Sequence, residues 1–156
     1  MGIEETLATA WADLTRLEPA EALEAIGVTG TYIVDIRPEY QRRAAGEVPV
    51  AIVIERNHLE WRLDPSSDAR IPEAVDASIR WIILCEGGYA SSLAAQSLRR
   101  LGLLRSTDVI GGFEAWRAAG LPVDRPDRPR RPRGPGEGRW PPPPDAGGDG
   151  RRRSLV

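Results

Sequence analysis

Short apolar runs alternate with amphipathic stretches along the first 124 residues of the chain. The runs at 32–36, 51–54, 80–84 and 108–110 have the length and the apolar content of buried strands. The stretches between them have helical spacing and are bounded by Pro and Gly, which favour helix starts and helix ends. Strands that alternate with helices predict an α/β fold: a three-layer α/β/α sandwich with a mostly parallel central sheet.

Punctuation residues place the helices of this pattern. Pro19 and Pro38 stand where a first-turn proline fits, at the starts of helices that end near 26 and 45. A short helix is expected at 57–63, and another runs from 113 to the Gly at 120. Apolar residues at helical spacing predict one helix at the N-terminus, with Leu7, Trp11, Leu14 and Leu17 on its apolar face.

Charge and composition divide the chain after residue 124. Up to that point there are 12 Arg against 19 acidic side chains, whereas 125–156 holds 9 Arg against 4. The second segment also contains 8 of the 14 Pro and 6 of the 16 Gly, so it has too little apolar surface to offset its chain entropy. We therefore expect a folded part up to 124 and a disordered Pro/Arg/Gly-rich tail at 125–156.

Three rare residue types limit the chemistry. The 21 basic side chains are all Arg, so a Schiff-base lysine and a Walker A lysine are excluded. One Cys, at 85, and one His, at 58, cannot form an internal disulfide or a structural Cys/His zinc site. The sequence shows neither a secretory signal nor an apolar run long enough for a membrane span, and we expect a cytoplasmic protein.

Cys85 is the leading candidate for a reactive residue. It follows the most apolar strand, and ligands of open α/β sheets bind at the carboxyl ends of strands. Gly87 and Gly88 allow the backbone to curl with its N–H groups toward one point, and a helix is expected to begin at Ser91 and Ser92, the natural N-cap positions. Such a cradle favours a thiolate. The alternative is that Cys85 is a small buried apolar residue.

Four motifs in a fixed order resemble the single-domain rhodanese family, the thiosulfate sulfurtransferase-like proteins. The first two are the segments 35–40 (DIRPEY) and 46–51 (GEVPVA). The third is the strand and Cys85 with the residues up to Ser92, and the fourth is 111–116 (GGFEAW) followed by 120–122 (GLP). The resemblance implies a rhodanese-like domain at 16–124, preceded by a helical extension at 1–15.

The resemblance also implies a ping-pong transfer of sulfane sulfur. The Cys85 thiolate would take the outer sulfur of thiosulfate or of another persulfide donor, and would pass it to a thiol or to cyanide. The backbone of the following loop would bind the transferred sulfur, through Glu86, Gly87, Gly88, Tyr89, Ala90 and Ser91. No metal and no organic cofactor is implied.

The expected partners of such a protein are a small-molecule sulfur donor and a thiol acceptor, with a protein as a further candidate acceptor. No membrane or nucleic-acid partner is expected. The tail at 125–156 could meet an acidic partner, a proline-binding module or RNA phosphates, but charge runs of this kind are usually solvated surface, and the sequence names no partner for the tail.

Three positions depart from the family pattern. Ala90 stands where many active members have Arg, Glu86 places an acid beside the thiol, and Val50 replaces a Gly. A missing Arg removes a bidentate partner for an anionic donor, so weak saturation by thiosulfate is expected. Arg62 or Arg37 could supply the charge, although an Arg in the position of Arg37 more often ties loops together.

Two alternatives to a sulfurtransferase stay open at this point. One is a rhodanese-like binding or regulatory module for a sulfur-carrier partner, with weak catalysis or none. The other is a phosphatase of the same superfamily, which the sequence disfavours because those loops are longer and end in Arg. His58 is expected to pack or to be a bystander, and Asp35 is expected to be a buried hydrogen-bonding residue.

Overall fold

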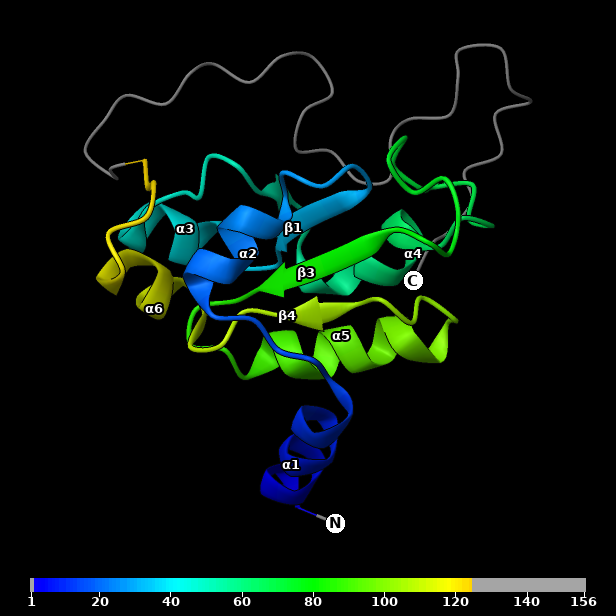
Figure 1. The fold of residues 1–156 in the computed structure, drawn as a ribbon, viewed down its shortest axis with the longest axis horizontal. Helices are drawn as coiled ribbons and strands as arrows, with labels where there is room; N and C mark the ends of the chain where they lie inside the picture. Colours follow the sequence, from blue (N-terminus) through cyan, green and yellow to red (C-terminus); the bar gives the residue numbers. More distant parts are fainter. Residues whose placement is uncertain (1, 125–156) are drawn as a thin grey trace.

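The computed structural model describes residues 2–124, and Figure 1 shows their arrangement. The strands form one sheet in the order β2-β1-β3-β4, and all neighbouring strands in it are parallel. Their bounds are Thr31–Asp35 for β1, Ile52–Val53 for β2, Arg80–Leu84 for β3 and Thr107–Asp108 for β4. The mostly parallel sheet is therefore confirmed. The expected tail at 125–156 lies outside the described residues, and the domain boundaries given above stay a prediction.

Helices cover both faces of this sheet. On one face lie α1 (Ile3–Asp13), α4 (Leu59–Leu63) and α5 (Ala90–Arg100), and α1 packs on α5. On the other face lie α2 (Pro19–Ala25), α3 (Glu39–Ala45) and α6 (Gly112–Ala118). The short helix η1 (Arg56–His58) leads directly into α4. This arrangement is the expected three-layer sandwich. None of the helices within residues 2–124 is long and apolar enough to cross a membrane.

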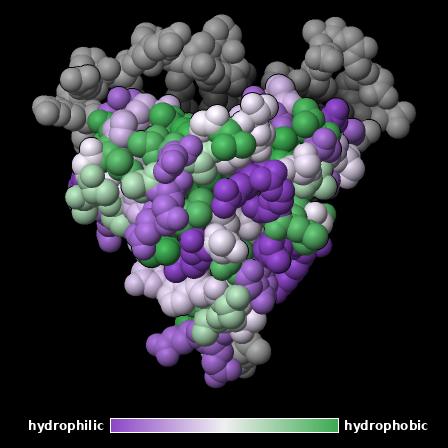
Figure 2. Space-filling model, in the orientation of Figure 1, coloured by the Kyte–Doolittle hydropathy of each residue, from purple (hydrophilic) through white to green (hydrophobic). Residues whose placement is uncertain are grey.

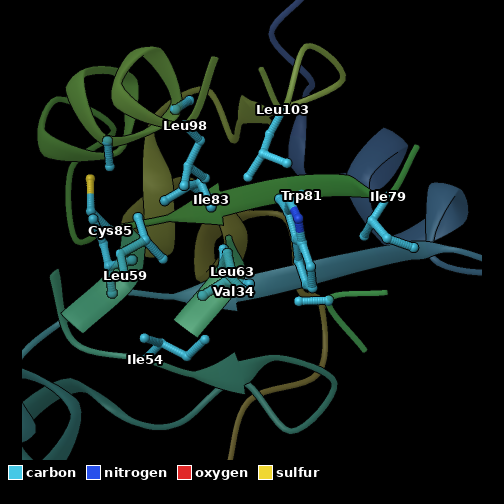
Figure 3. Packing of buried hydrophobic residues seen from close by; sticks show 14 of the residues in the cluster. Val34, Ile54, Leu59, Leu63, Ile79, Trp81, Ile83, Cys85, Leu98 and Leu103 are labelled. Carbon is cyan, nitrogen blue, oxygen red and sulfur yellow. The ribbon is translucent and has the colours of Figure 1, made fainter. Parts of the chain in front are cut away.

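The apolar core has two parts because the side chains of β3 alternate between the two faces of the sheet. Trp81, Ile83 and Cys85 belong to the cluster under α4 and α5, part of which Figure 3 shows. Ile82 and Leu84 belong to the cluster under α2 and α6. A strand that is buried on both faces has an unbroken apolar sequence, and this is why β3 could be predicted without error.

The predicted N-terminal helix is too long. The helix ends at Asp13, and Leu14 already has extended backbone geometry, with ψ at 140°. Leu14 packs in the cluster on the α5 face, whereas Leu17 packs in the cluster on the opposite face and forms a parallel bridge with Val109. The chain must pass around the edge of the sheet between these two leucines, and a continuous helix cannot do so.

The last strand was placed too late, at 108–110, because the apolar pair at 109 and 110 suggested it. The strand comprises Thr107 and Asp108. Val109 and Ile110 follow it, and their N–H groups donate to Ile83 and Leu17 at 3.0 and 2.8 Å. This correction matters for the site, because it makes Asp108 a strand residue that is completely buried.

Candidate functional site

Cys85 directly follows β3, at the carboxyl end of the sheet, and is 6% exposed. Its sulfur is the acceptor of two backbone hydrogen bonds. The N–H of Gly88 donates to Sγ at 3.1 Å, and the N–H of Ser91 donates at 3.3 Å. Figure 3 shows Cys85 at the edge of the apolar cluster. The loop after β3 therefore forms a partial cradle of N–H groups around one sulfur atom, which favours a negative charge there.

Gly88 gives this loop its shape. Its φ of +87° lies in the left-handed region, where a side chain would be strained. A Cβ at this position would also lie 2.6 Å from the backbone nitrogen of Gly111. The loop thus turns tightly against the start of α6 while its N–H groups face the sulfur.

The start of α6 holds the other side of the loop. The N–H of Phe113 donates to the carbonyl of Cys85 at 2.7 Å, and the N–H of Glu114 donates to that of Glu86 at 3.1 Å. Gly112 has a φ of +60°, and a Cβ there would overlap the Cys85 carbonyl and lie 2.7 Å from the Gly88 nitrogen. The Gly-Gly pair therefore allows the two segments to approach closely, with carbonyls toward α6 and N–H groups toward Sγ.

A buried carboxylate supports the loop from β4. Asp108 accepts hydrogen bonds from the Ser91 hydroxyl at 2.7 Å and from Arg16, through Nε at 2.8 Å and Nη2 at 3.1 Å. The Ser92 hydroxyl lies 2.8 Å from Asp108 Oδ2, and Arg16 Nη2 also donates to the Gly88 carbonyl at 2.9 Å. Asp108 and Arg16 thus fix both the first turn of α5 and the middle of the loop.

A second buried ion pair holds the first residue of the loop. Arg37 donates to Asp35 through Nη2 at 2.8 Å and to the Gly46 carbonyl at 2.9 Å, and its Nη1 lies 3.3 Å from a carboxylate oxygen of Glu86. Burial lowers the pKa of Arg37, but the hydrogen bonds and charges of Asp35 and Glu86 outweigh it, so the pKa lies above its usual range. The guanidinium also lies over the Phe113 ring, 4.0 Å from its centroid.

A pocket of about 400 Å³ opens beside Cys85. Its walls come from the end of β1, from α3, from η1 and from the loop, and consist of Ile36–Pro38, Tyr40, Gln41, Arg56, Cys85–Gly87, Tyr89 and Ala90. Tyr40 and Tyr89 are 72% and 61% exposed. Figure 2 shows polar and apolar residues interspersed over one face of the molecule. The site is a pocket with a thiol and two arginine side chains in its lining.

The family model for the rhodanese-like domain matches residues 18–119 of this sequence. The chain belongs to the rhodanese-like domain family. The thiosulfate sulfurtransferase GlpE of Actinobacillus pleuropneumoniae is 32% identical over 110 residues, which is 70% of this chain and 93% of that protein. The adenylyltransferase and sulfurtransferase MOCS3-2 of Zea mays is 36% identical over 84 residues, or 54% of this chain, but the match spans only 17% of the length of the maize protein.

A solved structure is similar over a larger share of this rhodanese-like chain. It belongs to a protein of unknown function from Rhodopseudomonas palustris that is described as a possible tyrosine phosphatase. The sequences are 32% identical, the TM-score is 0.71, and the match covers 80% of this chain and 95% of that one. The three-layer fold expected from the sequence is that of the rhodanese family.

The predicted site residues are contiguous, and most of them line the pocket of the rhodanese-like domain. Cys85, Glu86, Gly87, Tyr89 and Ala90 belong to its lining. The other two predicted residues contribute through their backbone, since the N–H groups that contact Sγ are those of Gly88 and Ser91. The geometry brings the predicted loop together around the thiol, and the roles of its residues stay a prediction.

The predicted serine N-cap of α5 is wrong. The helix begins at Ala90, with Tyr89 as its N-cap, and no side-chain cap is formed. Ser91 and Ser92 lie in the first turn, where both side chains are fully buried against Asp108. A carboxylate from β4 satisfies these hydroxyls, so they are not available to cap the helix.

Neither of the two arginines considered as substitutes for the absent loop Arg takes that place. Arg62 donates to the Ala69 carbonyl at 2.8 Å and does not line the pocket. Burial lowers its pKa despite the charge of Glu73. Arg37 is completely buried in the ties described above, as the Asp-x-Arg pattern suggested, and Asp35 is indeed a buried hydrogen-bonding residue.

Sequence reasoning missed three residues of the site. Arg16 and Asp108 lie 92 positions apart, and no local motif marks their contact. Arg56 lines the pocket from η1. The only signal for it is that the expected helix at 57–63 lies at the mouth in this family. His58, from the same segment, is not among the pocket-lining residues. Within residues 2–124, no group of three His, Cys, Asp or Glu side chains is placed to hold a metal ion.

Proposed function

We propose that this protein is a sulfurtransferase in which Cys85 carries a persulfide during turnover. The observation that carries the proposal is the pair of N–H groups, from Gly88 and Ser91, at 3.1 and 3.3 Å from Sγ in the wall of a pocket. These donors favour the thiolate, which is the nucleophilic form of cysteine. Membership of the rhodanese-like family and the named activity of the GlpE relative support the same reaction.

The proposed reaction has two displacements. In the first, the Cys85 thiolate attacks the outer sulfur of thiosulfate, the S–S bond of the donor breaks, and sulfite leaves with the bonding electron pair. Cys85 then holds one additional sulfur as a persulfide. In the second, a thiolate or cyanide attacks that outer sulfur, the new S–S bond breaks, and the Cys85 thiolate is regenerated. The remaining loop N–H groups, of Gly87, Tyr89 and Ala90, are the candidates for holding the outer sulfur.

Thiosulfate is expected to saturate the enzyme poorly. The loop residues 86–90 contain no Arg, and the carboxylate of Glu86, which is 27% exposed, repels a dianion. Arg37 compensates part of this charge at 3.3 Å. A Michaelis constant for thiosulfate in the low micromolar range would contradict this expectation. A thiol persulfide or a protein persulfide is therefore a further candidate donor.

Intact-mass spectrometry tests the proposal. The protein is incubated with thiosulfate or with an alkyl persulfide, and the mass should increase by one sulfur atom and return to its first value after cyanide is added. Cys85→Ser is the control, and should not gain this mass. Labelling of the Cys85→Ser variant, or no labelling of the wild type by either donor, would refute the sulfurtransferase. In the second case a rhodanese-like binding module for a sulfur-carrier partner becomes the better explanation.

A phosphatase is the rival enzyme class, because the similar Rhodopseudomonas palustris protein is described as a possible tyrosine phosphatase. The loop argues against it. A phosphate ester needs several donors around its oxygens and a bidentate guanidinium, whereas the segment between Cys85 and Ser91 contains no Arg. The same protein sample should therefore not hydrolyse p-nitrophenyl phosphate above the rate of Cys85→Ser.

A further inference from the structure

Arg56 is the cation of the pocket that a ligand can reach. The lining of the pocket contains two arginines, Arg37 and Arg56. The side chain of Arg37 has no exposed surface, and its donors are bound to Asp35, to the Gly46 carbonyl and to Glu86. The side chain of Arg56, in contrast, is 42% exposed. A ligand in the pocket can contact Arg56 without breaking a buried ion pair.

A chain of contacts holds Arg56 in its place. Its Nη1 donates to both carboxylate oxygens of Glu60, at 2.7 and 3.0 Å. Glu60 in turn accepts a hydrogen bond from the Ser97 hydroxyl at 2.6 Å, which connects this wall of the pocket to α5. Within the described residues these bonds use Nη1 alone, and the Nε and Nη2 donors of Arg56 are left for a ligand. Partly exposed ion pairs are weak, so a second anion can share the guanidinium.

We propose that Arg56 binds the anionic end of the sulfur donor or acceptor and so determines the charge preference of the site. This inference rests on the proposed function, because the ligand is the one that reacts at Cys85. Ala90 offers only a methyl group to the pocket, so the loop itself supplies no cation. A guanidinium matches the oxygens of a sulfonate or carboxylate group. With thiosulfate, Arg56 would contact the sulfonate oxygens that leave as sulfite.

Methanethiosulfonate reagents test this preference without any need for sulfurtransferase activity. They transfer their thioalkyl group to a thiolate and release methanesulfinate, and Cys85 is the only cysteine of the chain. The rate constants are measured with the neutral methyl reagent and with the anionic 2-sulfonatoethyl reagent. Their ratio cancels any change in the thiolate fraction of Cys85. We expect the anionic-to-neutral ratio to fall about tenfold in Arg56→Gln, because a charge-assisted contact is lost.

Arg43→Gln is the matched control. Arg43 also forms an ion pair with the residue four positions away, Glu39 at 2.9 Å, but it is 65% exposed and does not line the pocket. Its substitution removes the same charge and should leave the ratio within about twofold of the wild type, since exposed charges are screened. An equal ratio in Arg56→Gln and the wild type would overturn the proposal, and so would an equal fall in both variants.

A gain-of-function arm separates positioning from recognition. Adding Ala90→Arg to Arg56→Gln returns a guanidinium to the loop and should restore the ratio at least in half. With thiosulfate as the donor, Arg56→Gln should raise the Michaelis constant about tenfold with a smaller change in kcat. If no donor forms a persulfide in any variant, the sulfurtransferase fails, whereas an unchanged Michaelis constant in an active Arg56→Gln would refute only the role of Arg56.

Discussion

Replacement of Asp108 by Asn tests whether the β4 carboxylate supports the candidate loop. Asp108 is completely buried and accepts from Arg16 at 2.8 and 3.1 Å and from Ser91 at 2.7 Å. Asn keeps the shape but loses the charge and one acceptor oxygen. Removal of one partner from a buried ion pair costs about 3–5 kcal/mol. The side chain of Arg16 is 15% exposed and keeps its bond to the Gly88 carbonyl, so we expect the lower limit, about 3 kcal/mol.

Urea denaturation followed by tryptophan fluorescence measures this loss. With a denaturant slope of about 2 kcal/mol per molar urea, the midpoint should fall by about 1.5 M. A stability of about 5–15 kcal/mol is typical of a domain, so the variant should still be folded without urea. The rate at which Cys85 reacts with a neutral thiosulfonate should fall as well, because the Gly88 N–H loses its support. A midpoint within about 0.3 M of the wild type would refute the reasoning.

Two further variants define the origin of the effect. Asp13→Asn removes the same charge from an exposed residue whose printed partner is the Gln96 amide, and should change the free energy of unfolding by less than about 0.5 kcal/mol. Arg16→Gln and the double variant with Asp108→Asn complete a double-mutant cycle. We expect a coupling energy of about 1–3 kcal/mol between Arg16 and Asp108, and additive single effects would show that the two residues act separately.

Two other predictions follow from the structure. Gly112→Ala should abolish persulfide formation at Cys85 and lower the midpoint of thermal unfolding, because its φ is +60° and its Cβ would overlap the Cys85 carbonyl; unchanged labelling by mass spectrometry would contradict this. Burial raises the pKa of Glu60, but hydrogen bonds from Ser97 and Arg56 outweigh it, and the pKa lies below its ordinary value of 4.5. A carboxylate of this kind contributes stability that is present above its unfolded pKa and is lost as the pH falls through the native pKa. The urea midpoint of Glu60→Gln should therefore be lower than that of the wild type near pH 7, and the two should converge below about pH 4; a gap that persists near pH 3 would contradict the assignment.

The sequence predicted those parts of the fold whose causes are local. The strand from Arg80 to Leu84 was placed correctly because both of its faces are buried and its residues are uniformly apolar. Pro19 is indeed at the start of α2, where its missing N–H costs nothing. The Asp35–Arg37 tie could be anticipated for the same reason, since the two residues are two positions apart.

The parts that could not be predicted depend on contacts between distant segments. The hydroxyls of Ser91 and Ser92 have the composition of an N-cap, and their true role follows only from the position of Asp108 on the neighbouring strand. The length of the first helix is limited by the edge of the sheet, which no periodicity in 3–17 reveals. Arg56 has the sequence pattern of an ordinary i,i+4 ion pair with Glu60, and its place in the pocket depends on how η1 packs beside the loop.

The two buried ion pairs explain why a backbone loop can hold a defined shape at this site. Desolvation makes buried ion pairs poor sources of net stability, so their stability contribution does not explain their presence. Their geometry does, because Arg37 reaches Glu86 at the first position of the loop and Arg16 reaches the Gly88 carbonyl at the third. With these two points fixed from β1 and β4, the N–H of Gly88 has one orientation relative to Sγ. The charge of the ligand can then be read by a separate wall, through Arg56, without any cation in the loop. A substitution at 56 or 90 should therefore alter the preferred ligand charge while the N–H contacts to the sulfur stay as they are.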